Sequence, residues 1–265
     1  MADLVLVETR GTVAVVTLNR PDAGNAMDHA LLTELRAVTE RLLRTSELGG
    51  VLLTGAGKDF CRGGDLREMR DRLDDPAIDS AAYSDELTGL LSAAVRNLRE
   101  LPCPVLGAVN GQAAGAGMSL ALACDLRIVS RKAVFHFAYG AIGASTDGGM
   151  AWFLPRIVGY ARALELLLEQ PMIRPRAAVE MGLVSAVTEP DELLDTALHR
   201  LMVLADAAPH SVRSAKQLLD SSLDSSLGEH LAAESRMFAA GAVSADLRTG
   251  IGALLAGESP EFVGR

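Results

Sequence analysis

Two glycine-rich segments of the chain have the composition of anion-binding turns. Phe60–Leu66 and Asn110–Gly117 each follow a short apolar run, contain several small residues and precede a helical pattern. Turns of this kind leave backbone N–H groups pointing outward at a helix N-terminus, where the helix dipole favours negative charge. Two such groups that meet at one oxygen atom form an oxyanion hole, and each donor contributes on the order of 3 kcal/mol. Tight packing of a strand against a helix also explains either segment alone.

Further along the chain, a single acidic residue lies in another glycine-containing segment that precedes a helical pattern. Asp147 is followed by Gly148 and Gly149 and lies just before the apolar residues Trp152 and Phe153. Apolar surroundings desolvate a carboxylate, which raises its pKa towards a value that suits a general base near neutral pH. The same position also suits an aspartate that caps the N-terminus of the following helix. The residues alone leave both roles open.

Motifs for several other chemistries are incomplete. Gly57-Lys58 is followed by an aspartate, not by the serine or threonine of a P-loop. The run Gly115–Gly117 lacks the third glycine of a dinucleotide-binding fingerprint. Ser119 lies about ten residues beyond the preceding apolar run, whereas a nucleophile elbow places its serine directly after a strand. The five histidines have no metal-ligand spacing, so we expect no metal site.

Composition and charge narrow the class of protein. The 265 residues include 25 lysines and arginines and 34 aspartates and glutamates, which gives a net charge of −9. A negative surface repels phosphate backbones, so we expect no nucleic-acid partner. The longest apolar run is far shorter than the roughly 18 residues of a membrane span, and the first residues lack the features of a secretory signal. Three scattered cysteines are typical of reduced proteins, and we expect a cytoplasmic protein without a membrane partner.

Apolar periodicity predicts the elements that position these residues. Strand-like runs alternate with helical patterns in the first half of the chain, which indicates an α/β fold, and helices dominate after about residue 148. We therefore expect a core over residues 1–200 and a helical region over residues 201–265. Strands are expected at 4–7, 13–18, 51–53, 105–109, 126–129, 134–137 and 184–187. Helices are expected at 31–43, 66–73, 77–101, 117–124, 153–169, 175–181, 191–207, 211–223, 228–240 and 244–255.

Several short motifs follow one another along nearly the whole chain. They are Leu18–Met27, Phe60–Leu66, Val109–Asp125, Gly148-Gly149 with Leu154–Gly159, Gly182–Val184 and Ser259–Phe262. In these motifs the chain resembles the crotonase, or enoyl-CoA hydratase/isomerase, superfamily. The resemblance implies a spiral of ββα units and a C-terminal helical region through which homotrimers or dimers of trimers assemble. It also implies acyl-CoA thioester substrates, with coenzyme A as part of the substrate and no separate cofactor.

The resemblance also implies roles for individual residues. By position, the N–H groups of Gly64 and Ala116 are the two donors to the thioester oxygen of an enolate. Lys58 and Arg62 would contact phosphate groups, and Phe262 would close the adenine end of a site, often that of a neighbouring subunit. The loop residues expected along the coenzyme A arm are Ala26, Met27, Arg62, Asp65 and Leu66.

Two positions separate the reactions of this family. The hydratases carry glutamates where this chain has Ser119 and Tyr139. Neutral hydroxyls are poor bases at pH 7, so efficient addition of water is disfavoured. Asp147 stands where isomerases of the family, including the phenylacetate-pathway isomerase, place a single catalytic aspartate. We therefore expect an enoyl-CoA isomerase that moves a double bond from β,γ to α,β, with Asp147 as the proton shuttle. Ser119 and Tyr139 would shape the acyl pocket or hydrogen-bond to Asp147 or to the substrate.

Three alternatives stay open. Aryl-CoA dehalogenases of the family use an aspartate at the position of Asp147 as a nucleophile, but they place a tryptophan at that of Tyr139 and a histidine at that of Leu90. Residual hydratase or decarboxylase activity is the second alternative. The third is a protein that binds acyl-CoA thioesters without turnover, in which Asp147 is only a helix cap.

Overall fold

Continuous apolar runs in the strands explain why the main sheet is covered on both faces. The computed structural model describes residues 3–264. In β2 (Val13–Leu18), Val13 and Val15 pack against α8 (Leu193–Ala205), whereas Val16 belongs to the larger core on the opposite face. Successive side chains of a strand point to opposite faces, so an apolar run without alternation predicts a sheet buried between two layers.

The main sheet has six strands in the order β1-β2-β3-β4-β6-β9, and a second sheet has three in the order β5-β7-β8. The pair β1/β2 is antiparallel, and the other neighbours in the main sheet are parallel. Parallel strands place their carboxyl ends, and the loops that follow them, at one edge of the sheet. The strands other than β2 are β1 (Val5–Arg10), β3 (Gly50–Gly55), β4 (Val105–Val109), β5 (Gln112–Ala114), β6 (Leu126–Ser130), β7 (Val134–His136), β8 (Met172–Ile173) and β9 (Ala186–Thr188).

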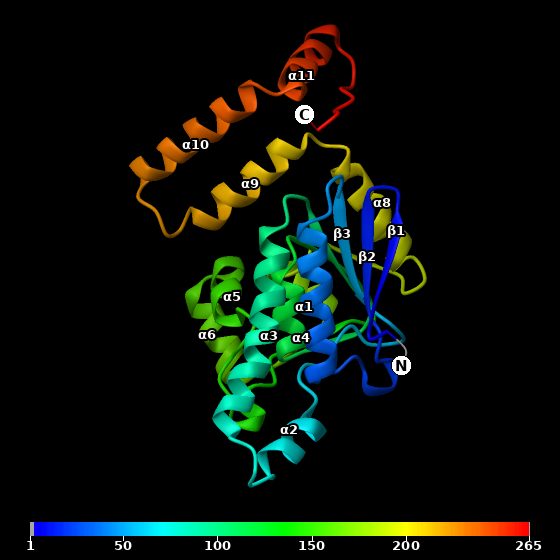
Figure 1. Ribbon diagram of the computed structural model, residues 1–265, viewed down its shortest axis with the longest axis vertical. Helices are drawn as coiled ribbons and strands as arrows, with labels where there is room; N and C mark the ends of the chain where they lie inside the picture. Colours follow the sequence, from blue (N-terminus) through cyan, green and yellow to red (C-terminus); the bar gives the residue numbers. More distant parts are fainter. Residues whose placement is uncertain (1–2, 265) are drawn as a thin grey trace.

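Helices form a layer on each face of the main sheet, as Figure 1 shows. α1 (His29–Leu43), α3 (Ser80–Glu100) and α4 (Ala116–Ala123) contribute to the larger core, and α8 covers the other face. The remaining helices before α8 are α2 (Leu66–Leu73), α5 (Met150–Val158), α6 (Tyr160–Glu169) and α7 (Pro175–Glu180). The helices after it are α9 (Pro209–Ser221), α10 (Leu227–Ala242) and α11 (Ala245–Ala256).

The expected α/β fold is confirmed, with three local differences. The expected helix over 153–169 is two helices, because Gly159 between them has φ +79°, outside the helical region. Strands β5 and β8 were not predicted from the sequence, since they contain only three and two residues. The boundary expected at residue 200 falls inside α8, where Leu201 is buried against the sheet.

The helices that leave the core therefore begin with α9. Figure 1 shows α9, α10 and α11 beyond the sheet, at the end of the molecule where the C-terminus lies. Their apolar side chains include many exposed ones, such as Phe238, Val243 and Leu254. Among residues 3–264, no helix is both long and apolar enough to cross a membrane.

Candidate active site

The two glycine-rich segments lie side by side. The amide of Ala114 donates to the carbonyl of Cys61 over 2.9 Å, and the amide of Cys61 donates to the carbonyl of Gln112 over 3.0 Å. A Cβ atom on Gly117 would lie 2.2 Å from the Cys61 carbonyl oxygen, so only glycine permits this approach. The glycine at the start of α4 therefore brings its N-terminus against the loop that precedes α2.

This contact places the amides of Gly64 and Ala116 on adjacent turns. In the described part of the chain, neither N–H has a hydrogen-bond acceptor, and Ala116 is the first residue of α4. A Cβ atom on Gly63, which has φ +94°, would lie 2.7 Å from the Ala114 carbonyl and 3.5 Å from the Ala116 nitrogen. The absence of side chains thus keeps the two turns close and leaves both amides available to a ligand.

Gly64 lies in the wall of a cavity of about 520 Å³. Positively charged side chains in this wall are those of Lys58, Arg62 and Arg67, and Lys58 is exposed and pairs with no acid among the described residues. Cations of this kind are suited to phosphate groups. The predicted binding residues that line the cavity are Ala26, Lys58, Arg62, Gly64, Asp65 and Leu66.

The carboxylate of Asp65 already has protein partners. Arg20 Nη2 lies 3.0 Å from Asp65 Oδ2, and Asp65 Oδ1 accepts hydrogen bonds from the first amides of α2. Burial raises the pKa of Asp65, but these hydrogen bonds from Arg20 and the helix amides lower it by more, so its pKa lies below the ordinary value. The side chain therefore fixes the cavity wall as a helix cap and ion-pair partner.

Two other predicted binding residues lie elsewhere. The side chain of Met27 is buried in the core, and its main chain bonds instead with Gly63 and Asp65 beside the cavity. Phe262 lies against Gly250 of α11 and lines cavities next to α9, not the cavity beside Gly64. Within one chain, Phe262 is thus separate from the other predicted residues.

The predicted proton shuttle forms a buried cluster with the two hydroxyl residues. Tyr139 Oη donates to Asp147 Oδ1 over 2.6 Å and lies 2.7 Å from Ser119 Oγ. Ser119 Oγ also lies 2.9 Å from the main-chain oxygen of Asp147. Ser119 is in the first turn of α4, which begins at Ala116, so one helical turn connects this cluster to the amide of Ala116.

The Asp147 carboxyl is not used as a helix cap. The N-cap of α5 is Gly149, which has no side chain to offer, and the Asp147 side chain bonds to Tyr139. Burial raises the pKa of Asp147 above the ordinary value, and the hydrogen bond from Tyr139 opposes that shift. Burial, the charge of Asp147 and the hydrogen bond to it all raise the pKa of Tyr139, so its phenol stays protonated at neutral pH.

Comparisons with known proteins identify the family. A sequence model described as enoyl-CoA hydratase/isomerase matches residues 8–265. The chain belongs to this family. It is similar to the 1,2-epoxyphenylacetyl-CoA isomerase of Escherichia coli, with 35% identity over 265 residues and 100% of both chains covered. It is also similar to the short-chain-enoyl-CoA hydratase of Clostridium acetobutylicum, with 36% identity over 88% of this chain and 87% of that protein.

Solved structures share the fold of this family member. The crystal structure of an enoyl-CoA hydratase from a Polaromonas species matches with a TM-score of 0.90 at 30% identity, over 98% of this chain and 99% of that chain. An enoyl-CoA hydratase from Bacillus anthracis matches with a TM-score of 0.91 at 28% identity, over 99% of this chain and 100% of that chain. The crotonase-type fold that the motifs predicted is therefore confirmed.

The sequence predicted both Trp152 and Phe153 as apolar neighbours of Asp147, but the two side chains differ in burial. Trp152 is 37% exposed and contacts Arg156, whose guanidinium lies 3.8 Å from the ring centroid. Phe153 is buried instead, and its ring lies where a Cβ on Gly149 would clash. Phe153 is thus the aromatic residue packed beside the loop of Asp147. In a helix, adjacent residues point about 100° apart, so only one of the two faces inward.

Sequence reasoning missed the part played by Arg20 in this family member. The side chain pairs with both Asp28 and Asp65, and it donates to the carbonyl of Ala26 over 2.5 Å. It thereby joins the segment before α1, which contains Ala26 and Asp28, to Asp65 at the start of α2. Arg20 occurs in the first of the recognised motifs, next to Pro21, which was the available signal, but its partners lie up to 45 residues away.

Among residues 3–264, no group of three or more histidine, cysteine, aspartate or glutamate side chains is placed to hold a metal ion.

Proposed function

We propose that this enzyme is an enoyl-CoA isomerase that moves a double bond from the β,γ to the α,β position. The observation that supports this proposal is the cluster around Asp147. It contains a single carboxyl group, whereas the two positions at which hydratases of the family carry glutamates hold the hydroxyls of Ser119 and Tyr139. One carboxylate suffices for an isomerisation, because the proton that it removes is the one that it returns.

In the proposed reaction, the thioester oxygen lies between the amides of Gly64 and Ala116. Asp147 accepts the proton when the C–H bond at the α-carbon breaks, and the electron pair delocalises as a dienolate onto the thioester oxygen. The same proton then returns to the γ-carbon, the new double bond forms between the α- and β-carbons, and Asp147 is again ionised. Because burial raises the pKa of Asp147, its carboxylate is a stronger base than an exposed aspartate.

Coenzyme A enters this proposal as part of the substrate, and the proton transfer needs no separate cofactor. The cavity with Lys58 and Arg62 in its wall is suited to the phosphate groups of the coenzyme A arm. The name of the similar Escherichia coli protein supports an isomerase, and that of the Clostridium protein keeps a hydratase as the second candidate.

We further propose that the enzyme assembles in the cytoplasm as a homotrimer or dimer of trimers. The exposed apolar side chains of α9–α11, including Phe238 and Leu254, support contact with other copies of the chain. Phe262 would then reach the site of a neighbouring subunit. Light scattering of the purified protein tests the assembly, and a mass equal to one chain would contradict it.

The experiment for the proposed reaction uses a cis-3-enoyl-CoA and follows formation of the conjugated 2-enoyl thioester. Wild type should conjugate the substrate, and Asp147→Asn should reduce kcat roughly 10²–10⁴-fold, the usual contribution of a positioned base. Asp85→Asn, an exposed position on α3, is the matched control and should retain full activity.

Two results would contradict the proposal. Faster addition of water to a 2-enoyl-CoA than conjugation of the 3-enoyl substrate would establish the hydratase. Acyl-CoA binding measured by calorimetry, without either reaction, would favour a protein that binds without turnover.

A further inference from the structure

The direction of the hydrogen bonds around Asp147 follows from a count of protons. Tyr139 has one hydroxyl hydrogen and gives it to Asp147 Oδ1 over 2.6 Å. The contact of 2.7 Å between Tyr139 Oη and Ser119 Oγ then needs the hydrogen of Ser119. Ser119 Oγ also donates to the main-chain oxygen of Asp147 over 2.9 Å, so its single hydrogen is shared between that oxygen and Tyr139 Oη, whereas the bond from Tyr139 to Asp147 has a fixed direction.

The two oxygens of the carboxylate differ in their contacts. Oδ1 accepts from Tyr139, whereas no other residue in the described part of the chain donates a hydrogen bond to Oδ2. We infer that Tyr139 and Ser119 are positioning residues that hold Oδ1 and leave Oδ2 as the oxygen that takes and returns the substrate proton. This inference rests on the proposed function, because it assigns roles within the same reaction.

The cluster is rigid enough for such a role. Ser119 has no exposed surface, and Tyr139 is 8% exposed. The loop of Asp147 is held as well, since a Cβ on Gly148 would lie 2.8 Å from Leu91 of α3 and 3.0 Å from the Cβ of Ser119. Buried side chains keep their rotamers, so Tyr139 and Ser119 hold Asp147 Oδ1 in place before substrate binds.

Neutral donors are suited to a carboxylate that must change its charge. Among residues 3–264, the titratable side chain that bonds to Asp147 is Tyr139, while α3, α4 and α5 present Leu91, Ser119 and Phe153 to its loop. A cation at this place would hold the carboxylate in its ionised form, whereas a phenol stabilises that form more weakly. Without the Tyr139 hydroxyl, the pKa of Asp147 should rise further, because the hydrogen bond that lowers it is lost.

The test compares Tyr139→Phe, Ser119→Ala and the double variant over a range of pH. For Tyr139→Phe we expect kcat to fall about 10–100-fold, the value of a hydrogen bond to a charged group. The acid limb of the kcat/KM profile should move to higher pH, and KM should stay within about threefold of wild type. Ser119→Ala should move the limb less than Tyr139→Phe does, because Ser119 contacts Tyr139 and the main chain of Asp147 but not its carboxyl group. The two shifts should not add in the double variant, because both substitutions remove the contact between Ser119 and Tyr139.

A second measurement separates this inference from the proposed function. Carbon-13 NMR of the Asp147 carboxyl, assigned with Asp147→Asn, reports its titration without any substrate. A higher titration midpoint in Tyr139→Phe supports the positioning role even if wild type catalyses another reaction. Equal midpoints and equal acid limbs in wild type and Tyr139→Phe would overturn it.

A substitution that strengthens the phenol as a donor provides the opposite control. Site-specific 3,5-difluorotyrosine at position 139 keeps the ring shape and makes the hydroxyl more acidic. It should move the Asp147 midpoint to lower pH, whereas a purely structural role of Tyr139 would leave the midpoint unchanged. This variant also keeps the inference testable if Tyr139→Phe does not fold.

Discussion

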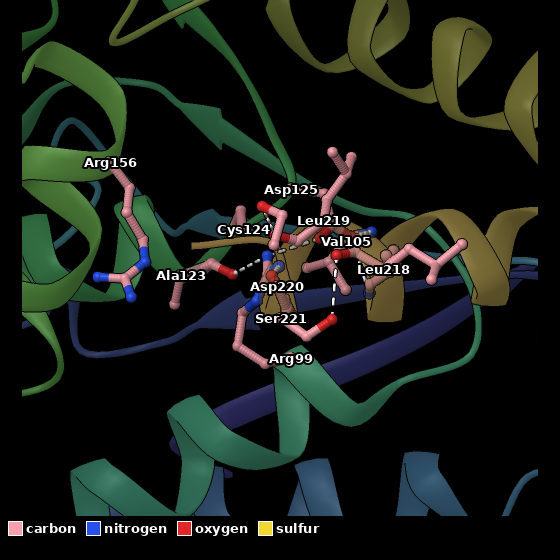
Figure 2. Close-up of polar contacts among 12 residues, drawn as sticks. Arg99, Val105, Ala123, Cys124, Asp125, Arg156, Leu218, Leu219, Asp220 and Ser221 are labelled. Atoms are coloured by element: carbon pink, nitrogen blue, oxygen red, sulfur yellow. Dashed lines mark hydrogen bonds and ion pairs between the residues drawn. The ribbon is translucent and has the colours of Figure 1, made fainter. Parts of the chain in front are cut away.

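Asp125 and Asp147 are two partly buried aspartates whose partners differ in charge. Asp125 accepts from Arg99 over 2.6 Å and from the amide of Val105 over 2.8 Å, and it lies 2.9 Å from Lys216 Nζ. Figure 2 shows Arg99 between Asp125 and Asp220 of α9. Asp147 bonds to a phenol and has no cation partner among residues 3–264.

This difference separates a structural carboxylate from one suited to catalysis. Two cations and an amide contact the carboxylate of Asp125, so removal of this carboxylate would break several contacts at once. The neutral donor of Asp147 permits either protonation state at a moderate cost. Burial alone therefore does not indicate a catalytic acid, and the charge of the partner is the more informative property.

The largest effect on stability is expected at Asp125. Asp125→Asn would leave Lys216 without its carboxylate partner and Arg99 with Asp220 alone, and the free energy of unfolding should fall by about 3 kcal/mol. Urea unfolding followed by circular dichroism measures this change, with the exposed substitution Asp85→Asn as the control. A loss no larger than that of the control would mean that the cluster does not stabilise the attachment of α9.

Asp147→Asn should raise the free energy of unfolding, and this change should be smaller than the loss expected for Asp125→Asn. The raised pKa of Asp147 means that folding disfavours its ionised form, so its destabilising contribution is present above the folded pKa and absent below the unfolded one. We expect the variant to melt roughly 2–4 °C above wild type at pH 7, the change that about 1 kcal/mol produces in a chain of this size.

The pH dependence of that difference is the sharper part of the measurement. Melting curves at pH 7 and pH 4.5 should show the gap between Asp147→Asn and wild type becoming smaller at the lower pH. A gap that is constant, or that grows as the pH falls, would show that the carboxyl is not disfavoured in the folded protein.

Much of the fold and part of the site could be predicted from local signals. The charged segment 66–73 was predicted as a helix with the bounds observed for α2, and paired glycines predicted a turn before α2 and another before α4. A hydrogen bond from Ser119 or Tyr139 to Asp147 was one of several alternatives, and the structure shows the bond from Tyr139. The apolar neighbours in sequence pointed equally to Trp152 and Phe153. The pairing of Asp125 with Arg99 and Lys216 could not be predicted either, because those residues lie 26 and 91 positions away from it in the sequence.

The smallest effect is expected for an exposed ion pair that joins the same two parts of the molecule. Arg156 Nη2 lies 3.1 Å from Asp224, but the Asp224 side chain is 62% exposed. Water screens such a pair, so Asp224→Asn should cost about 0.5 kcal/mol, and the cost should disappear in 1 M salt. Arg156→Gln should cost more, because it also removes the contact with the ring of Trp152.

A comparison of urea unfolding at low and high salt distinguishes these two contributions. If Asp224→Asn were as costly as Asp125→Asn, then the number of contacts between α9 and the core, and not the burial of their charges, would determine how firmly the C-terminal helices are held. The exposed fractions of 62% for Asp224 and 17% for Asp125 predict otherwise. Desolvated charges that lose a partner have no water to replace it, whereas exposed ones do.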